Sequence, residues 1–375
     1  MSDVRDGTHA SPKYYSQGYP LVTSKNLTSA GLDFSNISLI SELDYKNINK
    51  RSRVDKGDIL FGMIGTIGTP VMVHESNFAI KNVALIKERE AVLNSFLVQL
   101  LKSPAFINYI RNENVGGTQK FLSLNTIRNF RFSFPTSKEQ AMVSRFLEKI
   151  DSLIAATQRR IDDLEQVEKT LLQHLFDQSW RFNVYSDPWV KSKVANMAKE
   201  NFGGGTPSTK KRSFWTGSLP WIQSSDLDKS NKYTVIPKKF ISSAALKSSA
   251  AKKVPSNSIA VVTRVGVGKL AFINYDYATS QDFLSFSFLN WSAFFSVNLL
   301  TRVMEQMSNE GQGTSIKGVT KSELLAKSVL IPTSLEEQIS IGNLLKSFDD
   351  LIKSTSNRLS KLELLKTSLL KNLFV

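Results

Sequence analysis

The chain has 375 residues, no cysteine and a formal net charge of +15 at pH 7. This length predicts two domains, and 41% hydrophobic residues are enough for buried cores, which excludes a disordered chain. The lack of cysteine excludes disulfides and thiolate metal sites and fits the cytoplasm. The three histidines show no metal-ligand spacing. We also expect a soluble, unexported protein, because we find neither a signal core nor a run of about 18 apolar residues.

Positive charge is concentrated in two blocks of the chain. Residues 1–138 hold 17 Lys and Arg against 11 Asp and Glu, and residues 179–335 hold 20 against 9. The remaining segments, 139–178 and 336–375, are close to neutral. Dense polyanions such as DNA are natural partners for such blocks, because each neutralised phosphate releases counterions. A solvated basic surface is the alternative.

Residues 1–135 are predicted to form a first α+β domain. Short β-type runs such as "YPLVTSKNL" (19–27) and "VDKGDILFGMIGTIG" (54–68) are separated by Gly, Asn and Ser turns. A helical segment is expected at about 92–111. Pro135 closes the last strand-like run.

Residues 136–178 are predicted to form one long helix. Ser137 followed by Gln140 suggests a capping box, and no Pro or Gly interrupts the segment. Apolar and small residues recur every seven positions, at Ile150, Thr157, Leu164 and Leu171. Heptad spacing favours coiled-coil packing. About 38 residues at ~1.5 Å each give a rod of roughly 57 Å.

Residues 179–332 are predicted to repeat the first domain in a divergent form. The pieces recur in the same order, with "LPWIQSSDL" at 219–227 and "VPSNSIAVVTRVGVG" at 254–268. A helical segment is expected at about 292–308. The lead-in at 180–202 has only "MSDVRD" as its counterpart before the Gly7-Thr8 turn. The sequence therefore predicts that the first domain lacks an initial strand or helix.

Residues 333–375 are predicted to form a second long helix, a copy of the first. With an offset of 198, fourteen positions between 139 and 177 are identical to their counterparts, and the heptad stripe returns at Phe348, Thr355, Leu362 and Leu369. A second capping box is expected from Ser334 and Glu337. We predict an antiparallel coiled coil with pseudo-two-fold symmetry. Two helices packed separately on their own domains are the alternative.

Several motifs occur twice in the same order and cover almost the whole chain. They include "PTSKEQ" and "PTSLEEQ" before the long helices, "LLQHLF" and "LLKNLF" at their ends, and "GGGTPSTKKRSFWTGSLPWIQSSDL" at 203–227. In these motifs the chain resembles the specificity subunit of type I restriction–modification systems.

The resemblance implies a fold and a function. Each variable domain would be a target-recognition domain that reads half of an interrupted DNA site, and the helices would be both spacer and docking surface. Two modification subunits would bind S-adenosylmethionine and methylate adenine, and restriction subunits would use ATP and Mg for translocation and cleavage. The chain itself would be non-catalytic, without a cofactor. A rod of roughly 57 Å corresponds to one or two turns of B-DNA at ~34–36 Å per turn.

DNA contacts are expected from polar residues in Gly-flanked loops, where the backbone can approach the duplex. The first domain offers Lys13, Tyr14, Met63, Thr66, Lys81, Asn82, Gln119 and Lys120, with Arg51 and Arg53 as phosphate contacts. The second domain offers Lys210, Lys211, Arg212, Arg264, Lys269, Gln281, Asp282, Ser315 and Lys317. We expect Trp215, Trp221 and Trp291 in the core rather than stacked on bases, because each lies in an apolar run.

Two other functions are less compatible with the sequence. An adenine methyltransferase would need an Asn/Asp-Pro-Pro-aromatic box, and no Pro-Pro occurs. The segment "GVGKL" (266–270) lacks the first Gly and the final Ser or Thr of a phosphate loop. A coiled-coil scaffold whose basic domains bind DNA without sequence preference remains the alternative function.

Overall fold

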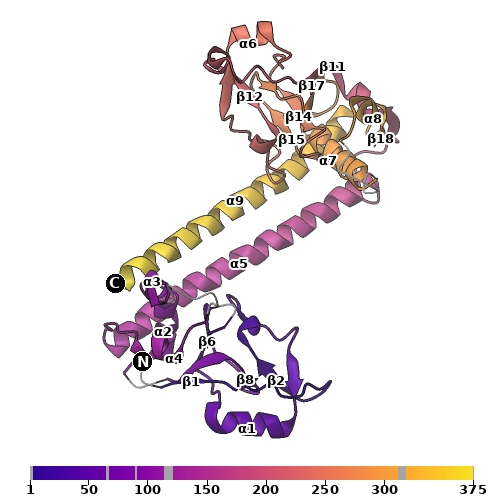
Figure 1. The fold of residues 1–375 in the computed structure, drawn as a ribbon. Helices are drawn as coiled ribbons and strands as arrows, with labels where there is room; N and C mark the ends of the chain where they lie inside the picture. The colour runs from indigo at the N-terminus through magenta and orange to yellow at the C-terminus, as the bar shows by residue number, and fades with distance from the viewer. Residues whose placement is uncertain (1–2, 65–66, 89–90, 114–120, 311–317, 375) are drawn as a thin grey trace. The chain divides into compact units, whose positions relative to one another are not determined.

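The computed structural model describes residues 3–64, 67–88, 91–113, 121–310 and 318–374. The chain divides into two compact units (Figure 1). Unit 1 comprises residues 1–159 and 357–375, and unit 2 comprises residues 160–356. Each unit therefore contains one α+β domain and about half of each long helix.

The core of unit 1 is built around a four-stranded antiparallel sheet in the order β1-β9-β6-β7. Its strands are β1 (Val4–Asp6), β9 (Val83–Ile86), β6 (Ile59–Gly62) and β7 (Gly68–Met72). The central strand β6 is buried on both faces. Ile59 and Phe61 pack with the helices, whereas Leu60 packs into a second apolar cluster on the other face. This explains why β6 is apolar throughout instead of alternating.

A second, three-stranded sheet in unit 1 has the order β5-β2-β8. Strand β2 pairs antiparallel with β5 and parallel with β8. The elements are β2 (Tyr19–Val22), β5 (Ser38–Ile40) and β8 (Ala79–Ile80), the hairpin β3 (Leu27–Thr28) and β4 (Gly31–Leu32), the turn η1 (Ser24–Asn26), and the helices α1 (Glu42–Ser52), α2 (Asn94–Leu101), α3 (Pro104–Glu113) and α4 (Leu124–Asn129).

Unit 2 repeats both sheets with the same topology, which confirms the prediction of two similar α+β domains. The four-stranded sheet has the order β11-β17-β14-β15, and the three-stranded sheet has the order β13-β12-β16. The elements are β11 (Ala198–Gly203), β12 (Leu219–Ile222), β13 (Lys239–Ile241), β14 (Ser258–Val262), β15 (Leu270–Ile273), β16 (Ala278–Thr279), β17 (Phe283–Leu289), α6 (Ser243–Ser248), α7 (Ala293–Glu310) and α8 (Lys321–Ala326), with the turns η2 (Val194–Met197), η3 (Arg212–Trp215) and η4 (Ser224–Asp226).

Unit 2 also contains a strand pair that has no counterpart among the described residues of unit 1. Strand β10 (Val190–Lys193), from the lead-in segment, pairs antiparallel with β18 (Ser328–Ile331), and Val190 lies opposite Ile331.

The two long helices are α5 (Ser137–Phe176) and α9 (Leu335–Leu373), as predicted (Figure 1). In unit 1, Asp151 of α5 forms an ion pair with Lys366 of α9. In unit 2, Leu175 near the end of α5 shares a core cluster with Leu345 near the start of α9. Early residues of one helix thus meet late residues of the other, so the helices are antiparallel. Of the eight predicted heptad residues, Ile150 and Thr157 are buried and the other six are half-buried.

The helix starts differ from the predicted capping boxes. At α5 it is the Thr136 hydroxyl, not Ser137, that accepts from the Glu139 amide, at 3.4 Å. Gln140 turns inward, where its amide accepts from the Leu93 N–H and donates to the Pro135 carbonyl, each at 2.9 Å. Ser334 caps α9 as predicted, but Glu337 binds the lead-in segment instead. Tertiary partners have replaced the local contacts. None of the described helices has the length and apolarity needed to cross a membrane.

Candidate nucleic-acid interface

Two loops of unit 2 pack directly against each other at the Gly-Gly-Thr turn. A Cβ atom on Gly204 would lie 1.8 Å from the Ser280 carbonyl oxygen, so only glycine allows this approach. The Thr206 hydroxyl donates to the Gln281 side chain at 2.5 Å. These contacts hold the Gln281 amide in place beside the turn.

A third and a fourth loop complete this arrangement. The Thr263 N–H donates to the Asp282 carbonyl at 2.7 Å, and the Val319 N–H donates to the Thr263 carbonyl at 2.8 Å. Backbone hydrogen bonds therefore join three segments that are far apart in the sequence. Side-chain positions on such a framework are fixed more firmly than on a free loop.

Together these loops surround a hollow of about 700 Å³, which we call the unit 2 hollow. Two predicted residues, Arg264 and Gln281, line it, and both are exposed. Sequence reasoning missed Val265, which is 72% exposed, and Lys321 at the start of α8. Lys321 follows the Gly-rich segment at 311–318, and this was the signal that could have identified it. The lining residues are Gly203, Gly204, Thr263, Arg264, Val265, Gly266, Gln281, Phe283, Leu284, Gly318, Val319, Thr320 and Lys321.

The other predicted residues of unit 2 lie near these loops. Lys210, Lys211 and Arg212 are exposed and form no ion pair with the described residues, although Lys211 lies 5.1 Å from the Phe214 ring centre. Lys269 donates to the Ser224 carbonyl at 3.2 Å, and Asp282 accepts from the Ser280 hydroxyl at 3.1 Å. Lys269 and Asp282 therefore brace the loops, whereas the three basic residues at 210–212 are available to phosphates.

The tryptophans lie where we expected. Trp221 and Trp291 are buried, and Trp215 is half-buried edge-on against Trp221, with ring centres 4.9 Å apart. Lys239 lies over both Trp215 and Trp221. These rings belong to the core and its rim.

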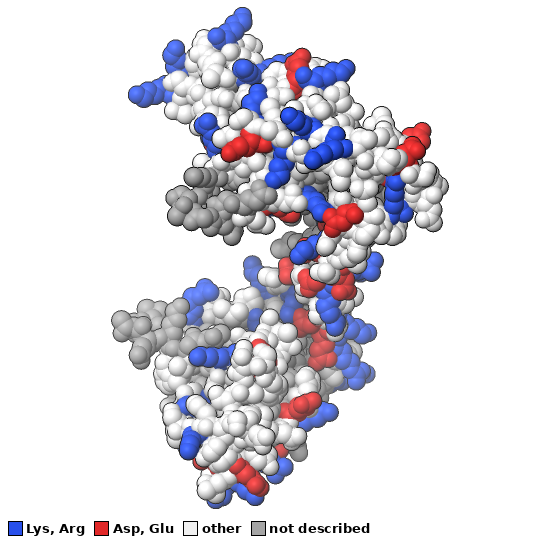
Figure 2. Space-filling model, turned by 90° about the vertical axis from the view of Figure 1, so that its right-hand side faces the viewer, with Lys and Arg blue, Asp and Glu red and all other residues white. Residues whose placement is uncertain are grey.

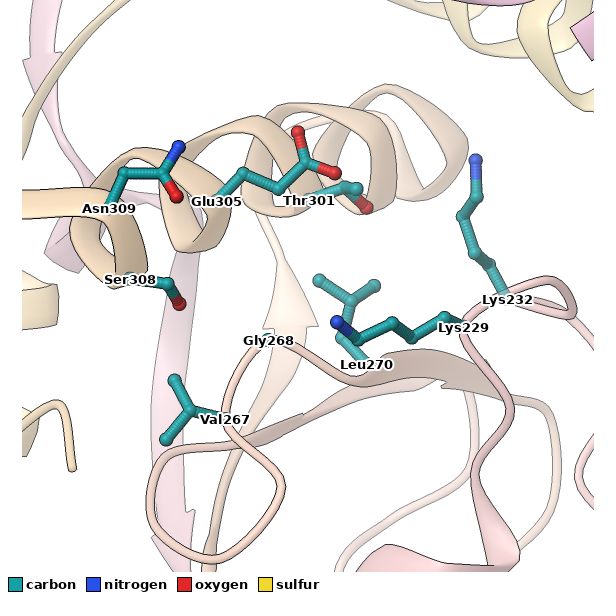
Figure 3. Close-up of a pocket in the computed structure, with 9 residues that line it drawn as sticks. All are labelled: Lys229, Lys232, Val267, Gly268, Leu270, Thr301, Glu305, Ser308 and Asn309. Carbon is teal, nitrogen blue, oxygen red and sulfur yellow. The ribbon is translucent and has the colours of Figure 1, made fainter. Parts of the chain in front are cut away.

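A smaller hollow of about 370 Å³ lies next to the 264–269 loop. Figure 3 shows Thr301, Glu305, Ser308 and Asn309 along α7 on one side, Val267 and Gly268 on the other, and Lys229 and Lys232 at one end. Glu305 contributes a carboxylate, and Lys232 is already hydrogen-bonded to Glu168, Asn298 and Asp349. With its charge largely compensated, this hollow is a weaker candidate for DNA contact.

Unit 1 holds its corresponding loops together in the same way. The Thr8 N–H donates to the Ile80 carbonyl at 3.0 Å, and the Asn82 N–H donates to the Thr8 carbonyl at 3.1 Å. Lys81 donates to the Ser11 hydroxyl at 2.8 Å. Lys13 and Tyr14 are exposed on the same loop. Four predicted residues, Lys13, Tyr14, Lys81 and Asn82, thus belong to one connected surface.

The remaining predicted residues of the first domain differ in accessibility. Arg51 pairs with Asp6, and Arg53 with Asp55 at 3.2 Å, so these guanidinium groups are already engaged. Met63 is only 1% exposed and belongs to the core, which leaves its side chain out of reach of DNA. Thr66, Gln119, Lys120, Ser315 and Lys317 lie outside the described residues.

The surface charge follows the sequence pattern. In Figure 2, Lys and Arg side chains outnumber Asp and Glu on the visible face of the unit 2 domain, in the upper part, whereas basic and acidic side chains alternate along the helices. The described residues contain no group of three or more His, Asp or Glu that could hold a metal ion.

The family model for the type I restriction modification DNA specificity domain matches this chain twice, at residues 8–166 and 186–364. The chain belongs to this family. Each match covers one α+β domain and most of the long helix that follows it, so the repeat seen in the sequence is a repeat of the family domain. The sequence-based assignment to the specificity subunits is confirmed.

Individual relatives agree with this assignment. The chain is 29% identical over 198 residues to the type I restriction enzyme MjaIX specificity subunit of Methanocaldococcus jannaschii, an alignment that covers 50% of this chain and 44% of that subunit. It is 21% identical over 374 residues to the proposed MjaX specificity subunit of the same organism, with 93% of this chain and 85% of that protein aligned. The S subunit structure from M. genitalium matches with a TM-score of 0.65 at 12% identity, covering 100% of this chain and 93% of that chain. This last likeness concerns the fold.

Proposed function

We propose that this chain is the DNA-recognition subunit of a type I restriction–modification complex and that it reads an asymmetric, bipartite site in double-stranded DNA, one half per domain. The observation that carries the proposal is the unit 2 hollow, where loops distant in sequence bring Arg264 and Gln281 to one exposed surface. The corresponding surface of unit 1 presents Asn82 and Lys81 instead. Two similar frameworks with different side chains suit two different half-sites.

The chemistry of these side chains is suited to reading bases. A guanidinium can donate two hydrogen bonds to the O6 and N7 atoms of guanine, and a Gln or Asn amide can bind the N6 and N7 atoms of adenine. Each good bidentate pair contributes about 1–3 kcal/mol of discrimination. The hydrogen bond between Thr206 and Gln281 orients the amide before DNA binds. Lys210, Lys211 and Arg212 would hold phosphates next to it.

We further propose that the helices α5 and α9 dock two modification subunits and that restriction subunits join this assembly in the cytoplasm. Both helices keep large apolar side chains at the surface, including Leu153, Val167, Leu351 and Leu364, each between 42% and 70% exposed. Such side chains on otherwise charged helices favour protein partners. S-adenosylmethionine, ATP and Mg would be bound by those partners, and this chain would be non-catalytic.

The alternative is a scaffold whose basic domains bind any DNA, which the net charge of +15 would equally support. Competition experiments on the complex with its modification subunits distinguish the two. A sequence-reading subunit predicts a duplex containing the methylated motif to compete at least ~10³-fold better than random duplex at the same salt. Equal competition by both duplexes would favour the scaffold.

Mutations in the unit 2 hollow test the proposal at the level of residues. We expect Arg264→Ala and Gln281→Ala to relax the methylated motif at positions of one half-site only, as measured by methylome sequencing of cells carrying the complex. Lys247→Ala, an exposed residue on α6, is the matched control and should leave the motif unchanged. If the hollow variants leave the motif unchanged, these residues are not base readers.

A further inference from the structure

The lead-in segment of unit 2 covers the start of α9 through a buried carboxylate. Arg181 donates two hydrogen bonds to Glu337, both of 2.7 Å, and Trp189 donates a third from Nε1 at 3.1 Å. Glu337 is only 1% exposed as a result. The carboxylate is thus neutralised and satisfied by one arginine and one tryptophan of the same segment.

The same segment adds a strand. Four residues of β10 pair with β18, and Ile331 at the end of β18 becomes 7% exposed. Tyr185 reaches the helix itself, with its hydroxyl 2.9 Å from the Ser340 hydroxyl. This side of the unit 2 domain is therefore covered by β10 together with Arg181, Tyr185 and Trp189.

Unit 1 has an equivalent surface that can be matched residue by residue. Gln140 and Gln338 make the same contacts, since each accepts from a backbone N–H ahead of α2 or α7 and donates to the preceding proline carbonyl. Upstream of the long helices the match shifts by one residue: α4 matches α8, and Phe134 before Pro135 corresponds to Ile331 before Pro332. The other matched pairs are Glu139 with Glu337, Met142 with Ser340, and Phe146 with Leu344.

In unit 1 these positions are uncovered. Phe134 is 47%, Met142 60% and Phe146 51% exposed. Glu139 is also exposed and forms no ion pair with the described residues. Residues 131–134 match β18 in sequence position but pair with no described strand, and of the two phenylalanines among them Phe132 is half-buried and Phe134 is exposed. We call Phe134, Glu139, Met142, Phe146 and the backbone of 131–134 the α5-start surface.

We propose that the α5-start surface binds an extended segment of a partner polypeptide that carries an arginine and, about eight residues further on, a tryptophan. An unpaired edge accepts an added strand through its backbone groups. The exposed Phe134 and Phe146 suit an apolar partner, and Glu139 requires a cationic one, as Glu337 does in unit 2. The chain's own lead-in segment is the template for this partner, because it fills the matching place on a domain of the same fold.

A peptide with the sequence of residues 180–197 is the probe, labelled for fluorescence anisotropy and titrated with the full chain. We expect saturable 1:1 binding that weakens at least tenfold for Phe134→Ser and for Glu139→Gln, and equally when the peptide's arginine becomes alanine. Leu43→Ser, an exposed apolar residue on α1 of the same unit, is the matched control and should bind as tightly as the original chain. All substituted side chains are exposed, so folding should be preserved, and circular dichroism checks this.

Two results would overturn the proposal. One is the absence of saturable binding, or binding that the Phe134→Ser and Glu139→Gln variants retain. The other comes from sedimentation velocity, if the chain forms a dimer that Phe134→Ser abolishes and excess peptide does not disperse. In that case a second copy, and not a strand of a partner, covers the surface.

Discussion

At the scale of single residues, the ammonium group of Lys232 connects three helices. Its ammonium group lies 3.2 Å from Glu168 of α5, 3.1 Å from Asp349 of α9 and 3.2 Å from Asn298 of α7. The internal repeat of the long helices explains why a positive charge is needed at this position. Asp349 corresponds to Asp151, but Glu168 corresponds to Lys366, so the direct ion pair of unit 1 becomes two facing carboxylates in unit 2. Lys232 compensates both.

We expect Lys232→Met to destabilise unit 2 by about 3 kcal/mol, because removing one partner leaves buried carboxylates uncompensated. Urea unfolding followed by circular dichroism measures the change. Lys353→Met, an exposed lysine on α9, is the control and should change stability by less than about 0.5 kcal/mol. A loss in Lys232→Met as small as in the control would show that the ion cluster is not stabilising.

The same cluster predicts a pH dependence. Burial raises the pKa of the Asp349 carboxyl, with Glu168 adding to the shift, while Lys232 opposes it. For an acid with a raised pKa in the folded state, stability is lost as pH rises from the unfolded pKa of about 3.8 through the folded value. Without Lys232 the pKa of the Asp349 carboxyl rises further, so more stability is lost as the pH rises. The deficit of Lys232→Met should therefore be larger at pH 7 than at pH 4; an equal deficit at both would contradict this explanation.

At the scale of elements, the two faces of the long helix α9 differ in exposure. Leu362 in the predicted heptad stripe is half-buried, whereas Leu364, two residues further on, is 70% exposed. A two-residue step on a helix turns the side chain through about 200°, which separates these faces. The heptad stripe therefore includes the less exposed of these two leucines, and its pairing with the other helix stays a prediction.

Leu362→Asp and Leu364→Asp form a matched pair of substitutions. We expect Leu362→Asp to cost about 2 kcal/mol, because a charge would replace the apolar contacts between the helices that the heptad pattern predicts. Leu164→Asp should act in the same way on unit 2. Thermal unfolding at 222 nm measures stability, and size-exclusion chromatography with the modification subunits measures assembly. Leu364→Asp should leave stability unchanged and weaken assembly only if partners use the outer face. Equal stability losses at 362 and 364 would argue against the paired-helix model.

At the scale of the whole molecule, charge is segregated between domains and helices. The blocks 1–138 and 179–335 carry the excess of Lys and Arg, while the helices carry both signs in similar numbers. In the proposed function, we therefore expect long-range attraction to DNA to act on the domains and protein partners to bind the helices. The same division appears on the surface in Figure 2.

Salt dependence tests this division. For random duplex, the plot of log affinity against log salt should lose up to about 2.7 units of slope when Lys210, Lys211 and Arg212 are all changed to Ala, since each phosphate contact contributes about 0.9. Changing Lys353, Arg358 and Lys361 of α9 to Ala removes the same charge from a helix and should change the slope little. If both triple variants change the slope equally, net charge alone drives binding.

The sequence by itself determined what repeats: two α+β domains, two long helices, their antiparallel pairing and the family. The domains and helices follow from periodicity and from internal identity, which are local or compare the chain with itself, whereas the family follows from the resemblance of the repeated motifs to the specificity subunits. The basic loops were also identifiable, because Gly-containing turns and clusters of Lys or Arg can be recognised directly in the amino-acid sequence. Only the tertiary structure decided which loops meet around the unit 2 hollow, that Met63 is buried, that Arg51 and Arg53 are paired, and that Gln140 leaves its capping box. Burial and ion pairing depend on neighbours distant in the chain, which no local pattern specifies.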